Sequence, residues 1–234
     1  MPRPPRAPRA LLALLTPLLL VLGLAACSKD EDPTTLPNGS TLVSESAAVM
    51  RSVQSTHIVI EVDGAIGSLP IKKAQGDLKR NGDAKGDIQL LQFGQLIQLD
   101  FVLLGGDAYL KFPTGGWQKS AGGTAAFPYD PSAILDPDRG VAKLLSTATN
   151  ARTEGSETIG GVDTYRVAVD FDNTAASALV PGVPPGVKGQ VWLDKQTKHL
   201  LKAVVNSPAS GGTAAATMTV TLTNIDAPVT ISAP

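Results

Sequence analysis

The sequence has one cysteine in 234 residues, few aromatic side chains and only two histidines. A single cysteine excludes an intramolecular disulfide, so the fold must be held together by its apolar core. Aromatic residues make up 4% of the chain, too few for the stacking surface that sugar-binding or RNA-binding proteins use. Hydrophobic residues reach 43%, and because most of them are aliphatic, the chain has material for an aliphatic interior.

The N-terminus combines the features of a bacterial export signal. Three arginines lie within the first nine residues, the apolar stretch Leu11–Leu24 follows, and the run Leu24-Ala25-Ala26-Cys27 ends it without any acidic residue. Pro17 interrupts the apolar stretch, which is shorter than the roughly 20 residues that a membrane-spanning helix needs. A cysteine directly after the small residues is typical of a lipoprotein signal, because its thiol accepts a diacylglyceryl group before cleavage. The sequence therefore predicts a signal peptide at residues 1–26 and lipidation of Cys27.

Removal of that signal leaves an acidic protein with a polar N-terminal segment. The remaining chain has 17 basic and 21 acidic side chains, a formal charge of −4, which argues against nucleic acid as a partner. Residues 27–40 are polar and contain two prolines, so we expect a flexible tether there, followed by one domain at residues 41–234. Acyl chains on Cys27 would hold this domain at the outer face of the cell membrane.

Hydrophobic periodicity predicts both helices and strands. A helix is expected at residues 40–54, where Val43, Ala47 and Met50 recur at helical spacing and Ser40 or Thr41 supplies the N-cap. Short helices are expected at residues 131–135, 140–147 and 173–180, the last one capped by Asn173. Alternating stretches between glycine and asparagine turns predict strands at residues 58–62, 69–80, 84–93, 96–104, 107–112, 158–171, 187–194, 200–206 and 213–224.

The expected strands form two groups with short helices between them. Successive strands that are joined by short turns favour antiparallel meanders. We therefore predict an α+β fold with nine or ten antiparallel strands in one strongly curved sheet, or half-barrel, and with helices packed on its concave side.

One face of this sheet carries long apolar side chains. They are Ile97, Leu99, Phe101 and Leu103 on one strand, and Ile88 and Leu90 on its neighbour. Helices would either close over this face as a solid core or leave an apolar cavity beneath them. Alternation alone leaves both alternatives open.

Motifs for catalysis are absent from the sequence. It has no Gly-x-Ser-x-Gly elbow, no His-Glu-x-x-His and no glycine-rich phosphate loop. His57 opens an expected strand and His199 follows a turn, so a structural role is expected for both. The paired acids Asp136/Asp138 and Asp170/Asp172 fall at turns, where they cap helices or face solvent. We predict a protein that is not an enzyme, with no catalytic residue, no metal and no cofactor.

Several stretches of the chain resemble a known family, and together they cover nearly all of the sequence after the signal. In chain order they include residues 55–64, Gly76-Asp77-Leu78, Leu99-Asp100-Phe101-Val102, residues 129–145, Glu157-Thr158-Ile159, Val191-Trp192-Leu193, Met218-Thr219 and Pro228-Val229. In these stretches the chain is similar to the LppX/LprG/LprF family of mycobacterial-type cell-envelope lipoproteins.

This resemblance implies a half-barrel with helices across its mouth and a large apolar cavity for the acyl chains of envelope lipids. Ile88 matches a position that faces the cavity in such relatives, and strand alternation extends the assignment to Leu90, Ile97, Leu99, Phe101 and Leu103. The partners that it implies are triacylated glycolipids or lipids of the phosphatidylinositol type, and a lipid transporter. The expected function is to bind such lipids and carry or exchange them across the envelope. The alternative is a scaffold lipoprotein with a closed core that supports a lipid transporter.

Overall fold

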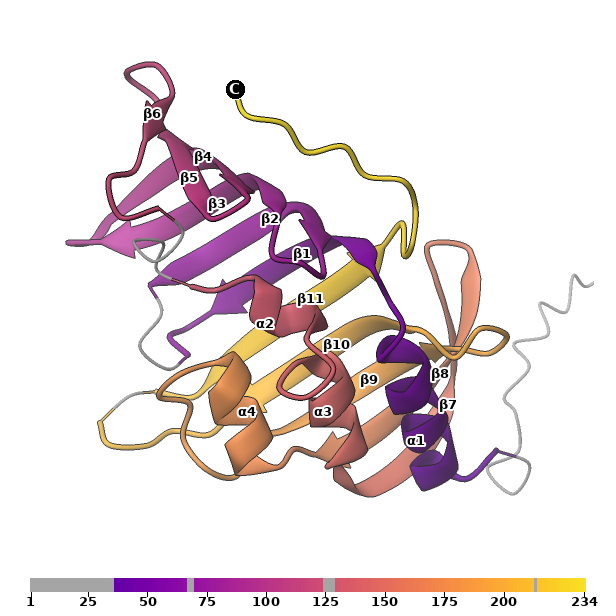
Figure 1. Ribbon diagram of the computed structural model, residues 1–234. Helices are drawn as coiled ribbons and strands as arrows, with labels where there is room; N and C mark the ends of the chain where they lie inside the picture. Colours follow the sequence, from indigo (N-terminus) through magenta and orange to yellow (C-terminus); the bar gives the residue numbers. More distant parts are fainter. Residues whose placement is uncertain (1–35, 67–69, 124–128, 213) are drawn as a thin grey trace, which may run out of the picture. The chain divides into compact units, whose positions relative to one another are not determined.

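Eleven antiparallel strands form a single curved, open sheet in the computed structural model, which describes residues 36–66, 70–123, 129–212 and 214–234 (Figure 1). These residues belong to one compact unit, Glu31–Pro234. The strands are β1 (Ser55–Asp63), β2 (Ile71–Lys79), β3 (Ala84–Gln92), β4 (Gln95–Leu104), β5 (Asp107–Lys111), β6 (Gln118–Lys119), β7 (Thr149–Ile159), β8 (Val162–Asp170), β9 (Lys188–Asp194), β10 (Leu200–Ser207) and β11 (Ala216–Thr223). The predicted α+β fold with one curved antiparallel sheet is confirmed.

Two meanders meet at the centre of this sheet. The strand order is β6-β5-β4-β3-β2-β1-β11-β10-β9-β8-β7, so neighbours in the sheet are neighbours in the sequence everywhere except between β1 and β11. That pairing runs from His57 opposite Thr223 to Asp63 opposite Thr217. The first and the last strand of the domain therefore join its two halves.

In the described part of the chain, four helices lie against one face of the sheet, which we call the inner face (Figure 1). They are α1 (Gly39–Met50), α2 (Ser132–Leu135), α3 (Val141–Ser146) and α4 (Asn173–Leu179). The side chain of Asn38 accepts a hydrogen bond from the N–H of Thr41, and Asp172 accepts one from Ala175. Both N-caps therefore lie before the residues that periodicity predicted, and α1 begins within the segment expected to be a tether.

The main difference from the expected elements is at one edge of the sheet. Residues 149–159 form β7, although the sequence predicts no strand between residues 112 and 158. The segment predicted as one strand at residues 158–171 contains the end of β7, a turn and β8. β7 is mostly exposed, pairs only with β8, and carries two register irregularities. An edge strand with neither a buried face nor strict alternation has no periodic signal to detect.

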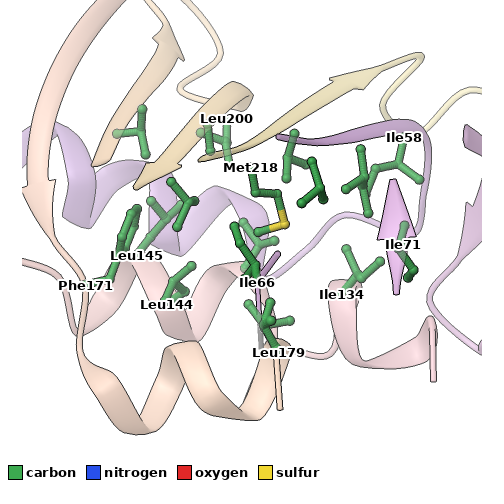
Figure 2. A pocket seen from close by; sticks show the side chains of 18 of the residues that line it. Ile58, Ile66, Ile71, Ile134, Leu144, Leu145, Phe171, Leu179, Leu200 and Met218 are labelled. Carbon is green, nitrogen blue, oxygen red and sulfur yellow. The ribbon is translucent and has the colours of Figure 1, made fainter. Parts of the chain in front are cut away.

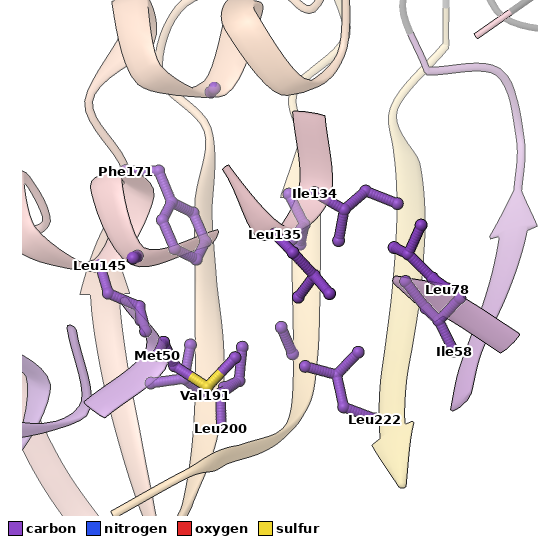
Figure 3. Close-up of a cluster of buried hydrophobic side chains, with 14 of the residues drawn as sticks. Met50, Ile58, Leu78, Ile134, Leu135, Leu145, Phe171, Val191, Leu200 and Leu222 are labelled. Carbon is purple, nitrogen blue, oxygen red and sulfur yellow. The ribbon is translucent and has the colours of Figure 1, made fainter. Parts of the chain in front are cut away.

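The core lies between the inner face and the helices. Leu222 and Val191 from the sheet, Met50 from α1 and Leu145 from α3 are among the buried side chains that meet there (Figure 3). The N-terminal meander adds Ile88, Leu99, Phe101 and Leu103 from β3 and β4 to the same cluster. A single apolar layer therefore extends from β9 to β4.

Candidate functional site

A cavity of about 110 Å³ lies between the inner face and the segments that cover it (Figure 2). Among the described residues, its lining is apolar at every position except Tyr129. The strands contribute Ile58, Ile60, Val62, Ile71, Val191, Leu200, Ala203, Val205, Met218 and Val220, and the covering segments contribute Ile66, Tyr129, Ile134, Val141, Leu144, Leu145, Phe171, Leu179 and Val180. Such a lining accepts hydrocarbon and disfavours charged or strongly polar groups.

The strand residues of the lining form the floor of the cavity, and the strand register determines which side chains lie there. Ile60, Val220, Ala203 and Val191 are successive Cα partners across β1, β11, β10 and β9. Directly opposed residues of antiparallel strands point to the same face, so these four side chains form one row. β-branched residues dominate this floor, and they suit a pleated, half-buried surface.

The covering segments form the roof of the cavity, and the turn between α2 and α3 holds part of this roof in place. Asp136 accepts hydrogen bonds from the N–H groups of Asp138 (2.8 Å) and Arg139 (3.2 Å), and from Arg139 Nε (2.9 Å). The backbone hydrogen bond from Asp138, together with the Arg139 guanidinium, lowers the pKa of the Asp136 carboxyl below its usual range. Arg139 also reaches Asp130 at 3.2 Å. These contacts fix α3, which carries Leu144 and Leu145 into the cavity wall.

A second set of contacts joins α1 to the same turn. Arg51, the residue after α1, donates to the Pro137 carbonyl and to Asp138, both at 3.1 Å. α1 itself is held against the sheet by buried Leu42, Val43 and Met50. The roof is thus anchored at the α1 side, whereas α2 has four residues and no side-chain cap.

Tyr129 is the polar side chain in the part of the lining that the structure describes. Burial raises the pKa of its phenol well above the usual range, so the hydroxyl stays neutral at any physiological pH. A neutral hydroxyl in an apolar wall can hydrogen-bond a carbonyl or hydroxyl of a ligand without attracting a charged group.

The six residues predicted to line a cavity lie on the inner face but outside the lining of this cavity. Ile88 and Leu99 continue the floor row, since Ile60 is opposite Ala74, Ala74 is opposite Ile88, and Ile88 is opposite Leu99. Of the six, Ile88, Leu99, Phe101 and Leu103 are buried, while Leu90 and Ile97 are partly buried. Their role in holding acyl chains stays a prediction.

The lining that sequence reasoning missed comes from two sources. The alternation of Ile58, Ile60 and Val62 in β1 is visible in the sequence and could have located the floor. No periodic signal indicates that Ile134, Leu144 or Leu179 faces the same space, because these residues belong to three short helices.

Cys27 and the predicted signal at residues 1–26 lie outside the described residues, as does most of the predicted tether. Across the described ranges, the structure contains no helix long and apolar enough to cross a membrane.

The polar residues considered for catalysis have structural partners. His57 Nδ1 lies 2.8 Å from Asp77 Oδ1, and hydrogen bonds from His57 and Lys85 outweigh the effect of burial and lower the pKa of the Asp77 carboxyl. His199 Nδ1 contacts the Thr197 hydroxyl at 3.0 Å. Asp172 caps α4 and Asp170 forms an ion pair with Lys188. No group of three or more acidic, histidine or cysteine side chains capable of holding a metal ion occurs among the residues that the structure describes.

Comparison with known proteins identifies the family. Residues 38–231 match the LppX_LprAFG lipoprotein family, which covers most of the chain. The chain belongs to this family. Among its members, the lipoarabinomannan carrier protein LprG of Mycolicibacterium smegmatis is 34% identical over 210 residues, which is 88% of each chain. LprG of Mycobacterium tuberculosis is 31% identical over 222 residues, 92% of this chain and 93% of that protein.

Solved structures of LppX_LprAFG proteins share the fold. LprF from Mycobacterium bovis has a TM-score of 0.73 at 22% identity, and the match covers 84% of this chain and 96% of LprF. The lipoprotein LppX from Mycobacterium tuberculosis has a TM-score of 0.61 at 19% identity, covering 82% and 97%. The resemblance read from the sequence is confirmed, and the arrangement of one curved sheet under helices is that of this family.

Proposed function

We propose that this protein is a lipid-binding lipoprotein of the cell envelope, which holds the acyl chains of an envelope lipid in the cavity under α2, α3 and α4 and carries or exchanges that lipid. The observation that carries this proposal is a cavity whose described lining is apolar apart from Tyr129, in a chain related over 88% of its length to a lipoarabinomannan carrier protein. A binding role rather than catalysis fits such a lining, because the described residues present no acid, base or nucleophile to a ligand apart from the Tyr129 hydroxyl, whose pKa burial raises.

The cavity must widen when an acyl chain enters. At about 110 Å³ it is smaller than the cavity of about 150 Å³ that holds one benzene molecule in an engineered lysozyme core. The floor belongs to a continuous sheet, whereas the roof contains the short helices α2 and α4. Outward movement of α2 and α4 would widen the cavity and leave the hydrogen bonds between the strands intact.

Energetics favour exchange without an energy source. Each buried methylene is worth about 0.8 kcal/mol, so a chain of about 16 carbons gains on the order of 12 kcal/mol of protection from water. A membrane offers nearly the same protection, so transfer between bilayer and cavity is close to thermoneutral. Aliphatic walls adapt to different chain lengths, and selectivity then depends on cavity volume and on the groups at its mouth.

The bound lipid is proposed to be a glycolipid or a lipid of the phosphatidylinositol type. A large polar headgroup cannot enter an apolar lining and stays in water, so the domain covers the acyl part alone. In this proposal the Tyr129 hydroxyl, which belongs to the cavity lining, hydrogen-bonds an ester carbonyl of the lipid. Lipidation of Cys27 holds the protein at the outer face of the cell membrane, and a lipid transporter is a further partner.

The test is lipid uptake by a form that starts at Glu31, which retains the compact unit and lacks Cys27. Native mass spectrometry after incubation with phosphatidylinositol should show a one-to-one complex. Ala203→Trp places a large ring on the cavity floor and should lower uptake at least tenfold. Ala168→Trp is the matched control, because Ala168 lies on the other face of the sheet, between inner-face residues Val167 and Val169.

Both variants must first show wild-type thermal unfolding. If Ala203→Trp does not fold, Ala203→Val and Ala203→Leu provide a graded series in which uptake should fall with side-chain volume. No uptake by the wild type, or equal uptake by the Ala203 and Ala168 variants, would reject the cavity as the binding site and favour a scaffold role.

A further inference from the structure

Large apolar side chains are exposed at the turn of the β3–β4 hairpin, which we call the hairpin tip (residues 91–96). The exposed fractions are 98% for Phe93, 64% for Leu96 and 40% for Leu91. Phe93 has a φ of +51°, a conformation that bulky residues rarely adopt. The Phe93 ring is therefore exposed to water in an unfavourable backbone conformation, and its burial contributes nothing to the stability of the core.

The hairpin tip projects beyond its neighbours in the sheet (Figure 1). Among the described residues, the hydrogen bonds between β3 and the β2 side of the sheet end at Leu91, whose N–H donates to the Pro70 carbonyl at 2.7 Å. On the other side, β5 follows β4 only back to Asp100, which is opposite Lys111. No strand that the structure describes therefore pairs with residues 92–95 of the tip, other than the two strands of the hairpin itself.

The hairpin tip lies at the centre of an uncharged stretch. No acidic or basic residue occurs between Asp87 and Asp100, and the polar side chains in that interval are four glutamines. Charges are expensive to bring into the boundary between headgroups and acyl chains, whereas apolar side chains are driven into it. A hairpin without charges suits a lipid surface better than a protein partner, which would be recognised through charges or a shaped pocket.

A second exposed aromatic group lies on the same side of the hairpin. Since β5 runs antiparallel to β4, Phe112 and Trp117 follow Lys111 toward the strand ends that carry the tip. They are 41% and 39% exposed, and the Lys111 ammonium lies 6.0 Å from the Trp117 ring centroid. Tryptophan beside lysine is typical of residues at the level of lipid headgroups.

The chain enters the domain at these same strand ends. One row of Cα partners runs along them from β7 to β1, through Thr149, Asp170, Lys188, Asn206, Thr217 and Asp63. The start of α1 packs here, because a Cβ on Gly39 would lie 2.8 Å from the Ala151 backbone in β7. Gly39 is twelve positions after Cys27, a segment that spans at most roughly 40 Å. A lipid anchor on Cys27 therefore leaves this end of the sheet within reach of the membrane.

Apolar side chains on the inner face lie between the hairpin tip and the cavity. Ile71 lines the cavity and is the Cα partner of Leu90, which is in turn the partner of Ile97. Leu91 and Leu96 are the next pair toward the tip and, because successive side chains of a strand alternate, they face the other side of the sheet. The inner face therefore presents Leu90 and Ile97 to an acyl chain that moves from the base of the tip toward Ile71.

We propose that the hairpin tip inserts into the lipid surface of the membrane and holds this end of the sheet against the acyl chains that the cavity receives. The reason for insertion rests on the proposed lipid-carrying function, but insertion itself is measured separately from uptake.

A fluorescence experiment tests insertion directly. The form that starts at Glu31 contains no cysteine, so Gln95→Cys accepts a single environment-sensitive dye beside Phe93. With phosphatidylcholine vesicles, the dye emission should shift to the blue and be quenched by nitroxide-labelled lipid. Val162→Cys is the control, because Val162 is an exposed apolar residue on the β7–β8 hairpin at the opposite strand ends. No shift at position 95, or equal shifts at both positions, overturns the proposal.

A substitution that spares the fold supplies the second test. Phe93→Asn gives an Asn-Gly turn, the preferred sequence where both central residues have positive φ, as Phe93 and Gly94 do. Vesicle flotation should show binding reduced at least tenfold, as expected for the loss of an inserted aromatic ring. Transfer of a fluorescent phospholipid out of vesicles should slow by a similar factor.

Equilibrium uptake of a short-chain, water-dispersed lipid separates the two proposals. Phe93→Asn should leave this uptake unchanged, because Phe93 is outside the cavity lining. If the wild type takes up no lipid but binds vesicles through the tip, the carrier function fails and insertion stands. If uptake is normal and Phe93→Asn binds vesicles as well as the wild type does, insertion is rejected and the tip becomes a candidate contact for a protein.

Discussion

The ring of Phe171 lies over the backbone of Gly189, where a Cβ would be 2.8 Å from the ring's Cε2 atom. Gly189 is the Cα partner of Val205 and Val169, so it occupies an inner-face position in β9. Phe171 lines the cavity and is 7% exposed. Because glycine at position 189 has no side chain, the Phe171 ring can pack there and line the cavity.

Gly189→Ala should destabilise the protein and reduce lipid uptake. The added Cβ meets both the Phe171 ring and the Val204 carbonyl oxygen, so either the ring or β10 must shift. We expect a loss of about 1–3 kcal/mol in unfolding free energy, measured by urea denaturation. Gly155→Ala is the control, since a Cβ there meets no atom within 4 Å. Equal stability of the two variants would contradict the close approach of Phe171.

Leu200→Ala should cost less stability when lipid is bound than when it is absent. Leu200 is 3% exposed and lines the cavity, so its truncation enlarges an empty space and should cost about 2–5 kcal/mol. An acyl chain that fills this space restores part of the lost contact, and a bound ligand stabilises the folded state alone. Thermal unfolding with and without saturating lipid measures the difference. The same loss in both conditions would mean that lipid does not reach Leu200.

Acidification should weaken the hold of the α2–α3 turn through Asp136. Because hydrogen bonds from Asp138 and Arg139 lower the pKa of Asp136 in the folded state, its stabilising contribution is fully present above the unfolded value of 3.8. That contribution is lost as the pH falls below this value and Asp136 is protonated. Asp136→Asn keeps one acceptor but cannot titrate, so its unfolding free energy should fall less between pH 5 and pH 3 (about these limits). Parallel pH profiles for wild type and variant would exclude this role.

Phe93→Asn should raise stability although it removes an aromatic residue. Asparagine tolerates positive φ better than phenylalanine does, and the side chain it replaces is 98% exposed. We expect a gain of about 0.5–1 kcal/mol by urea denaturation. Gly94→Ala serves as the opposite case, because it forces a Cβ into a φ of +78° in open space and should lower stability by a similar amount. A loss of stability in Phe93→Asn would show that the Phe93 ring has a packing role.

Prediction from the sequence succeeded where one face of a strand is buried. Ile58 to Val62 and Tyr165 to Val169 alternate because their inner-face side chains enter the core, and both segments lie within strands, although β8 is shorter than the strand predicted at residues 158–171. Prediction failed at β7, where little is buried, and at β6, which has two residues. The helix caps were placed at Ser40 or Thr41 and at Asn173 rather than at Asn38 and Asp172, because adjacent residues of similar capping ability cannot be ranked from sequence.

The sequence by itself determined the class of fold and the family, since these depend on local patterns and on ordered similarity, whereas the signal at residues 1–26 and lipidation of Cys27 stay predictions. Only the tertiary structure decided where the cavity lies. The pairing of β1 with β11 joins residues more than 150 positions apart, and it places Ile60 beside Val220 in the floor. The roof comes from short helices whose facing side chains depend on packing rather than on periodicity. The same pairing aligns the strand ends, so the start of α1 and the hairpin tip lie at one end of the sheet.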